Sequence, residues 1–130
     1  MTIEAIAEAF SRHRFAEAYP YLADDVRWHL VGGPTLRGAG EVRAACEATP
    51  RELETTETEF QKFRMIVGSD SVVVDAIGVY RDPAGLVSTV ASCDIFDFAD
   101  GNIAAMTSYT VELPSFDPEA EATNGSVGES

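Results

Sequence analysis

The sequence has few positively charged residues and few cysteines. Nine Lys and Arg residues stand against twenty-two Asp and Glu, which gives a formal net charge of −13 over 130 residues. Such a charge repels phosphate backbones and anionic lipid headgroups, so we expect neither nucleic acid nor a membrane as a partner. Cys46 and Cys93 are too few for a disulfide framework and are expected to be small buried hydrophobes. His13 and His29 are the only histidines, so we expect no metal site, and nothing in the sequence calls for a cofactor.

Long apolar segments are also missing. No stretch approaches the roughly eighteen apolar residues needed to cross a bilayer. Met1 is followed by Glu4 and Glu8 rather than by a basic region and an apolar run, so we expect neither a secretory signal nor a transit peptide. These absences favour a cytoplasmic protein whose thiols stay reduced.

The composition that remains is typical of one globular domain. Apolar residues make up 45% of the chain and aromatic residues 9%, enough for a core in a chain of this length. Residues 114–130 differ, because they are rich in Pro, Gly, Ser and Glu and contain no Lys or Arg. We expect residues 1–113 to form a single domain and residues 114–130 to form a flexible acidic tail whose removal leaves the fold intact.

Three helical segments are predicted in the first fifty residues. Apolar side chains at residues 3–10 recur at helical spacing, with Thr2 as the N-cap. A second short helical face covers residues 15–22, and we expect a break at Pro20 because proline removes a backbone donor. A third helix begins after Gly38 and ends before residue 50, which is a proline.

Strand patterns lie between the second and third helices and again after the third helix. Residues 26–31 alternate in polarity and predict one strand ahead of the third helix. From residue 58 onward the period is two, and turn residues divide the chain into four antiparallel segments. Helices followed by a run of strands favour an α+β fold, in which a curved antiparallel sheet packs on three N-terminal helices and encloses a pocket. The four late strands are expected at residues 60–67, 72–80, 86–98 and 103–113.

Two segments carry a family resemblance. They are YLADDVRWHLVGG at residues 21–33 and CDIFDFADGNIAAMTSYTVEL at residues 93–113. Both resemble the SnoaL-like branch of the nuclear transport factor 2-like superfamily, whose relatives include ketosteroid isomerases, limonene epoxide hydrolases and polyketide cyclases. The resemblance extends over about residues 3–113 and implies a cone-shaped sheet curled over the helices. Because folds of this kind host many activities, the site has to be argued residue by residue.

The resemblance also implies candidate acids. Asp94 falls where the isomerases carry the protonated acid of their oxyanion hole, and Asp75 falls about where the epoxide hydrolases carry their central acid. Both correspondences imply the concave face, so we expect the two carboxyls to share one pocket, less than about 10 Å apart. The match is incomplete, because the isomerase base would fall at Leu30 and its oxyanion tyrosine at about Ile6. Neither of those side chains can do that chemistry.

The expected function is metal-free acid–base chemistry on a mostly apolar small molecule: isomerisation, cyclisation, dehydration or epoxide opening. Asp94 would be the buried acid and Asp75 the base. His29 either turns toward the pocket as an acid–base partner or packs on the outer face, and His13 is expected to be solvated. The alternative is a non-catalytic ligand-binding protein of the same fold. The side chains expected to hold the ligand are Trp28, Leu30, Ser92, Phe96, Met106, Ser108 and Thr110.

The outer face of the sheet is the expected interface of a symmetric homodimer. Alternating apolar residues there have no predicted helix to cover them, and an exposed apolar patch of that kind usually marks an interface. The residues assigned to this face are Val72, Val74, Ala76, Tyr80, Cys93, Ile95 and Tyr109.

Overall fold

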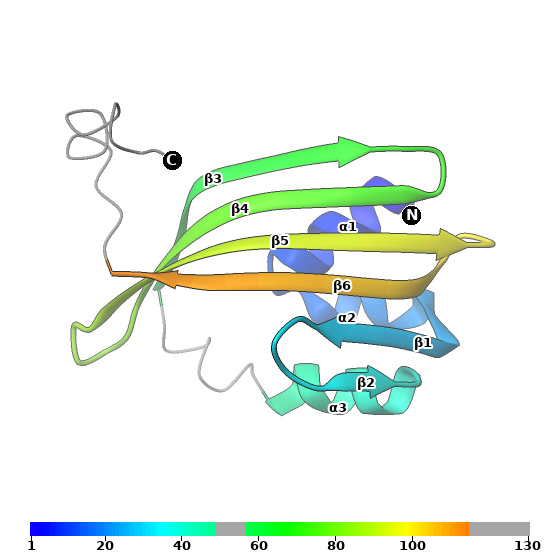
Figure 1. The fold of residues 1–130 in the computed structure, drawn as a ribbon, viewed down its shortest axis with the longest axis horizontal. Coiled ribbons are helices and arrows are strands. Elements are labelled where there is room, and N and C mark those ends of the chain that lie inside the picture. The colour runs from blue at the N-terminus through cyan, green and yellow to red at the C-terminus, as the bar shows by residue number, and fades with distance from the viewer. Residues whose placement is uncertain (49–56, 115–130) are drawn as a thin grey trace.

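The computed structural model of the chain describes residues 1–48 and 57–114. Helices lie against one face of a six-stranded sheet, and the opposite face carries none of the described helices (Figure 1). The expected acidic tail, beyond Pro114, lies outside the described residues. The elements are α1 (Ile3–Ser11), α2 (Phe15–Ala18), the 3-10 turn η1 (Tyr19–Tyr21), β1 (Leu22–Leu30), β2 (Thr35–Arg37), α3 (Ala39–Ala48), β3 (Glu57–Val67), β4 (Ser71–Arg81), β5 (Val87–Ala99) and β6 (Asn102–Leu113).

The predicted helices are confirmed. The Thr2 hydroxyl accepts a hydrogen bond from the backbone N–H of Ala5 at 3.1 Å and caps α1. Pro20 lies in η1, where the chain leaves the α-helix because proline cannot donate the next backbone hydrogen bond. No helix among the described residues has the length and apolar character that crossing a membrane requires.

The sheet is mixed. Its strand order is β2-β1-β6-β5-β4-β3, and the four-strand antiparallel meander from β3 to β6 is confirmed. β1 pairs in parallel with β6, so the sheet is not purely antiparallel. This pairing brings the first strand, with Trp28 opposite Met106, beside the last one. The short strand β2 was not predicted, because three residues are too few to show a period.

The concave face of the sheet forms the core with α1. Ile6 and Phe10 of the helix are buried against residues of β4, β5 and β6. In β4 the even-numbered side chains face inward, since Val74 pairs with Asp94 while Asp75 pairs with Cys93. The buried concave-face residues of these three strands include Val72, Val74, Ala76, Phe96, Ile103 and Met106.

This register corrects the expected composition of the outer face. Val72, Val74, Ala76 and Tyr80 point inward, whereas the assignment of Cys93, Ile95 and Tyr109 to the outer face agrees with the pairing of Cys93 with Tyr109. In β4, the residues expected on the outer face are those that face inward, so the expected alternation was wrong by one residue. The strand is apolar at both parities around Asp75, so alternation alone could not tell which set is buried.

Candidate functional site

A cavity of about 230 Å³ lies between α1, the loop that follows it and the concave face of the sheet. Cavities that hold drug-sized ligands measure about 300–1,000 Å³, so this one suits a smaller molecule. Aromatic side chains form much of its wall, and its polar groups come from the end of α1, the loop after it and the strands of the sheet. The lining residues are Phe10, Ser11, His13, Phe15, Trp28, Leu30, Phe60, Tyr80, Val90, Ser92, Asp94, Ser108 and Thr110.

Asp94 is the one carboxylate among the described residues that line this cavity. The Ser11 hydroxyl, at the C-terminal end of α1, donates to Asp94 Oδ2 at 2.9 Å. Ser108 pairs with Asp94 across β5 and β6 and also hydrogen-bonds its side chain. Trp28 Nε1 donates to Ser108 Oγ at 2.9 Å, so the Ser108 oxygen acts as an acceptor there and its own proton can point to Asp94. Two hydroxyls therefore fix the carboxyl group, and one of them is oriented in turn by Trp28.

The surroundings of Asp94 favour its neutral form. Burial raises the pKa of Asp94 above its ordinary value, and hydrogen bonds from Ser108 and Ser11 and the charge of His13 oppose this to a smaller extent. Burial, followed by the proximity of Asp94, also raises the pKa of Tyr80, which keeps that phenol protonated. The cavity thus combines a carboxyl group that holds its proton longer than usual with a phenolic donor.

His13 is the second titratable group of the cavity that can change charge near neutral pH. It follows α1 with a φ of 65°, and its backbone N–H donates to the Phe10 carbonyl at 3.0 Å. This left-handed turn directs the ring toward Phe15 and Tyr80, with ring centroids 5.5 and 6.0 Å away. Burial lowers the pKa of His13, and the charge of Asp94 raises it to a smaller extent. The expectation that His13 is solvated is wrong, because a loop position does not reveal the left-handed residue that turns the ring inward.

The positions of the predicted binding residues divide into two groups. Phe96 and Met106 do not line the cavity but are fully buried in the core, where the Phe96 ring packs edge-to-face on Phe10 at 5.8 Å. Phe96 and Met106 face inward as predicted, but they belong to the core because the cavity occupies only part of the concave face. The other five line the cavity: Trp28, Leu30, Ser92, Ser108 and Thr110.

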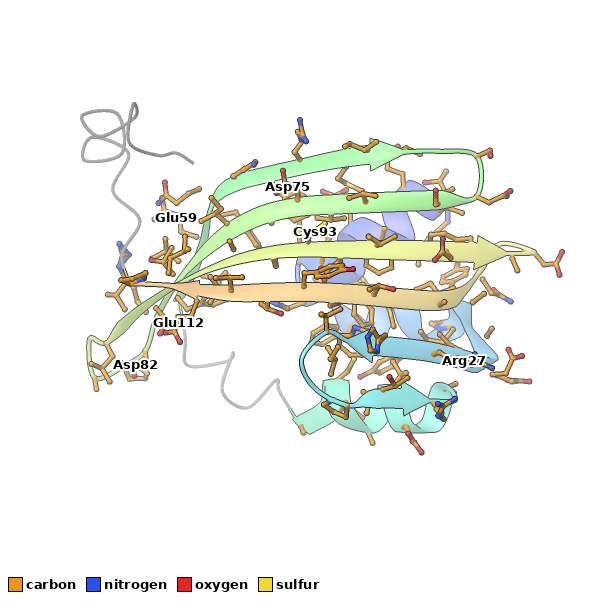
Figure 2. All side chains as sticks on the ribbon, in the orientation of Figure 1. Arg27, Glu59, Asp75, Asp82, Cys93 and Glu112 are labelled. Carbon is orange, nitrogen blue, oxygen red and sulfur yellow. The ribbon has the colours of Figure 1, made fainter. Side chains whose placement is uncertain are left out.

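The paired-acid geometry is wrong. Asp75 lies opposite Cys93 on the outer face of the sheet, where Figure 2 shows both side chains on the side away from the helices. Its carboxylate is 2.8 Å from Lys62 Nζ and 3.7 Å from the Arg64 guanidinium. The neighbouring positions in β3 thus neutralise Asp75, which cannot act on a ligand bound next to Asp94.

His29 also lies outside the cavity. It is exposed, and its Nδ1 is 2.8 Å from the Thr35 hydroxyl on the neighbouring strand β2. The strand continues through His29 without turning it inward, so the outer-face alternative describes its position. Within residues 1–48 and 57–114, no group of three or more His, Cys, Asp and Glu side chains is arranged to hold a metal ion.

The cavity residues that were not predicted also include Ser11, Tyr80 and Phe60. Ser11 lies four residues after Ala7 on the buried side of α1, so extending the apolar spacing by one turn would have found it. Tyr80 was missed through the one-residue error in β4, and Phe60 because the register of its strand is interrupted between Phe60 and Lys62.

Comparison with known proteins places these features in a family. The model of the SnoaL-like domain matches residues 3–106. No curated protein matches the chain at a significant level.

Solved structures share the fold. An NTF2-like protein of unknown function from Cytophaga hutchinsonii is 25% identical, with a TM-score of 0.74 over 83% of this chain and 95% of that one. An LEH-like epoxide hydrolase from M. tuberculosis is 22% identical, with a TM-score of 0.61 over 84% and 79% of the two chains. A protein with a ketosteroid isomerase-like fold from Catenulispora acidiphila, in complex with trimethylamine, is 16% identical, with a TM-score of 0.62 over 84% and 86%.

Proposed function

Because the chain belongs to the SnoaL-like domain family, we propose that it is an enzyme that uses metal-free acid–base chemistry on a small, mostly apolar molecule. The candidate reactions are isomerisation, cyclisation, dehydration and epoxide opening. Proteins that share this fold include an LEH-like epoxide hydrolase and a hypothetical protein with a ketosteroid isomerase-like fold. They support this range of reactions but do not favour one of them. The observation that carries the proposal is Asp94, a carboxyl group with a raised pKa in a largely aromatic cavity.

Asp94 and His13 divide the proton transfers between them. Environments that push two pKa values apart assign an acid and a base to one site. The raised pKa of Asp94 makes it the group that gives a proton to a substrate oxygen, and the lowered pKa of His13 leaves a neutral imidazole that accepts one. His13 therefore acts as the base, the role that was expected of Asp75 from the sequence.

The remaining polar groups position the acid. Ser11 and Ser108 hold the Asp94 carboxyl in one orientation, and Trp28 fixes Ser108 from the next strand. Since the Trp28 N–H is engaged by Ser108, its ring acts as cavity wall rather than as a donor to the substrate. Protonated Tyr80 offers a further hydrogen bond to a ligand oxygen.

A non-catalytic ligand-binding protein is the second candidate. The observation that favours it is the single carboxylate among the described cavity residues, with the apolar side chain of Leu30 at the position of the isomerase base. In that case Asp94 and His13 would only orient the ligand.

The test compares two Asp→Asn variants against a panel of small ketones, enones and epoxides, with product formation followed by NMR. We expect Asp94→Asn to lower kcat by at least about 100-fold, the range of a lost acid–base group, while binding changes by only a few-fold. Asp75→Asn is the matched control on the outer face and should leave turnover unchanged. Turnover that survives Asp94→Asn would refute the proposed role of Asp94, and ligand binding without turnover by the native protein would favour the second candidate.

A further inference from the structure

The cavity contains an ionisable carboxyl group with no cationic side chain among its described lining residues. Its described lining residues include Asp94 but no Lys or Arg, and the environment of His13 favours the neutral imidazole. The hydroxyls of Ser11 and Ser108 offer hydrogen bonds to the carboxyl group but no compensating charge. A carboxylate in this position is therefore left for a ligand to neutralise.

Aromatic rings line the same cavity as this carboxylate. Phe10 meets Phe15 edge-to-face at 5.0 Å and 66°, and it meets Trp28 at 5.1 Å and 80°. Because these rings are inclined to one another rather than stacked, they form walls instead of one flat surface. The aromatic residues that line the cavity are Phe10, Phe15, Trp28, Phe60 and Tyr80.

We propose that the cavity recognises a small ammonium cation, a protonated or quaternary amine held between the Asp94 carboxylate and these aromatic walls. Aromatic faces attract cations through the ring quadrupole, and aromatic cages with a nearby carboxylate suit quaternary ammonium groups. The inference rests on the proposed function in that both place the ligand against Asp94, but it adds the charge that the ligand carries.

The rim of the site already accommodates a cation of the protein itself. The Arg12 guanidinium lies 3.8 Å from the centroid of Phe63 and 5.5 Å from that of Phe60, a cavity residue. Arg12 also pairs with Glu8 at 3.0 Å on the surface, and it does not line the cavity. Arg12, the C-cap residue of α1, thus contacts Phe60, Phe63 and Glu8, and among the described residues Asp94 has no Lys or Arg as an ion partner.

Size and overall charge favour the same ligand class. A cavity of about 230 Å³ suits a compact head group rather than an extended molecule. The net charge of −13 also raises the local concentration of cations around the protein. This long-range effect acts on any cation, so it accounts for attraction to the molecule but not for binding at Asp94.

The pH dependence distinguishes a cation from an anionic or neutral ligand. The titratable groups around Asp94 are His13 from the loop after α1, Tyr80 from β4 and Cys93 on the opposite face of β5. Cation binding requires ionised Asp94 and neutral His13, and Tyr80 and Cys93 keep their protons because burial raises the pKa of each. The affinity for a cation of fixed charge should therefore rise with pH, whereas that for an oxyanion should fall.

The experiment measures binding of choline and of 3,3-dimethylbutan-1-ol to the full chain by NMR titration. The two probes have the same shape, but only choline carries a charge, and that charge does not change with pH. We expect choline to bind at least tenfold more tightly than the alcohol at pH 7.5, and we expect this preference to be lost in Asp94→Asn. The Asp75→Asn variant keeps the cavity and changes net charge equally, so its choline affinity should equal that of the native protein. If Asp94→Asn does not fold, the rise of choline affinity with pH in the native protein replaces it.

Each contrary result has a definite meaning. Equal affinities for the two probes, no binding of choline, or an equal loss in both Asn variants would overturn the cation inference. The proposed acid–base function would still stand if Asp94→Asn abolished turnover of a neutral substrate. Conversely, Asp94-dependent choline binding without any turnover would support the inference and refute catalysis.

Discussion

Two aspartates on neighbouring strands have opposite surroundings. Asp75 of β4 pairs with Cys93 of β5, so Asp94, one residue further along, faces the other side of the sheet. On the outer face Asp75 meets Lys62 and Arg64, and 29% of its side chain is exposed. On the inner face Asp94 meets two hydroxyls, aromatic rings and a histidine.

The difference shows how a sheet separates structural charges from reactive ones. Asp75 is paired with cations of its own chain and is partly exposed to solvent, so it needs no ligand as a partner. Asp94 has lost solvent without gaining a cation, which raises its pKa and leaves it able to respond to a ligand. A residue that breaks the usual pairing rule while its neighbour obeys it is a strong candidate for function.

The largest effect on the free energy of unfolding should come from introducing a carboxylate on the inner face of the sheet. Val74 is fully buried on the inner face, and its neighbour Val73 is half-buried on the outer one. We expect Val74→Asp to cost several kcal/mol, a large part of a typical total stability of about 5–15 kcal/mol, because the carboxylate has no partner there. Val73→Asp should cost about 1 kcal/mol or less. Urea unfolding followed by circular dichroism measures both, and equal losses would contradict the assignment of the two faces.

The second prediction concerns the outer face as a whole. Tyr109 is 48% exposed, and it lies beside Cys93 on a face that no described helix covers. The homodimer stays a prediction, and it requires a mass of about twice 14.0 kDa in light scattering at micromolar concentration. Tyr109→Arg should shift the protein toward the monomer, because it places two like charges in a symmetric interface. Leu86→Arg, in the β4–β5 turn, is the control, and a native protein that is already monomeric would contradict the prediction.

The third prediction is that ionised Asp94 destabilises the folded protein. Because its folded-state pKa lies above the ordinary value of 3.8, Asp94 contributes stability that is fully present below that pH. This contribution is lost as the pH rises through the folded-state pKa. Asp94→Asn should therefore raise the free energy of unfolding by about 1 kcal/mol at pH 7, which is in the range of single stabilising substitutions. Thermal melts should show the gain shrinking as the pH approaches 4, and a gain that is independent of pH would argue against ionisation as its cause.

The fourth prediction follows from His13, whose pKa is shifted in the opposite direction. A pKa below the ordinary value of 6.5 means that, as the pH falls, His13 is protonated at a lower pH in the folded protein than in the unfolded chain. The contribution of His13 to stability is present above pH 6.5 and is lost as the pH falls through the folded-state value. Histidine NMR signals should show His13 titrating below 6.5, and His13→Asn should remove that part of the acid destabilisation. A His13 midpoint above 6.5 would contradict the buried position of the ring.

The sequence predicted the fold more completely than the site. Helical spacing in α1, the break at Pro20 and the turns between the late strands are local signals, and the structure confirms them. The face of β4 depends on which parity packs against α1, and apolar residues at both parities leave this undetermined. His13 reaches the cavity through a single left-handed residue, which no periodic pattern marks. The sequence therefore predicted that Asp94 lines the pocket, but it did not identify His13 as its partner.

The smallest predicted effect concerns the Asp75 ion pairs and completes the comparison. Asp75→Asn removes contacts to Lys62 and Arg64, whose side chains are 46% and 64% exposed. Ion pairs this close to solvent contribute about 0–1 kcal/mol, so we expect a loss of about 0.5 kcal/mol in the free energy of unfolding. The loss should shrink between about 0.01 M and about 1 M salt, where the Debye length falls from roughly 30 to roughly 3 Å. Asp94→Asn should not show this salt dependence, since its effect comes from burial rather than from exposed charges. The same substitution on adjacent strands should thus destabilise the protein at Asp75 and stabilise it at Asp94, and two effects of equal sign would show that the faces do not differ as their surroundings indicate.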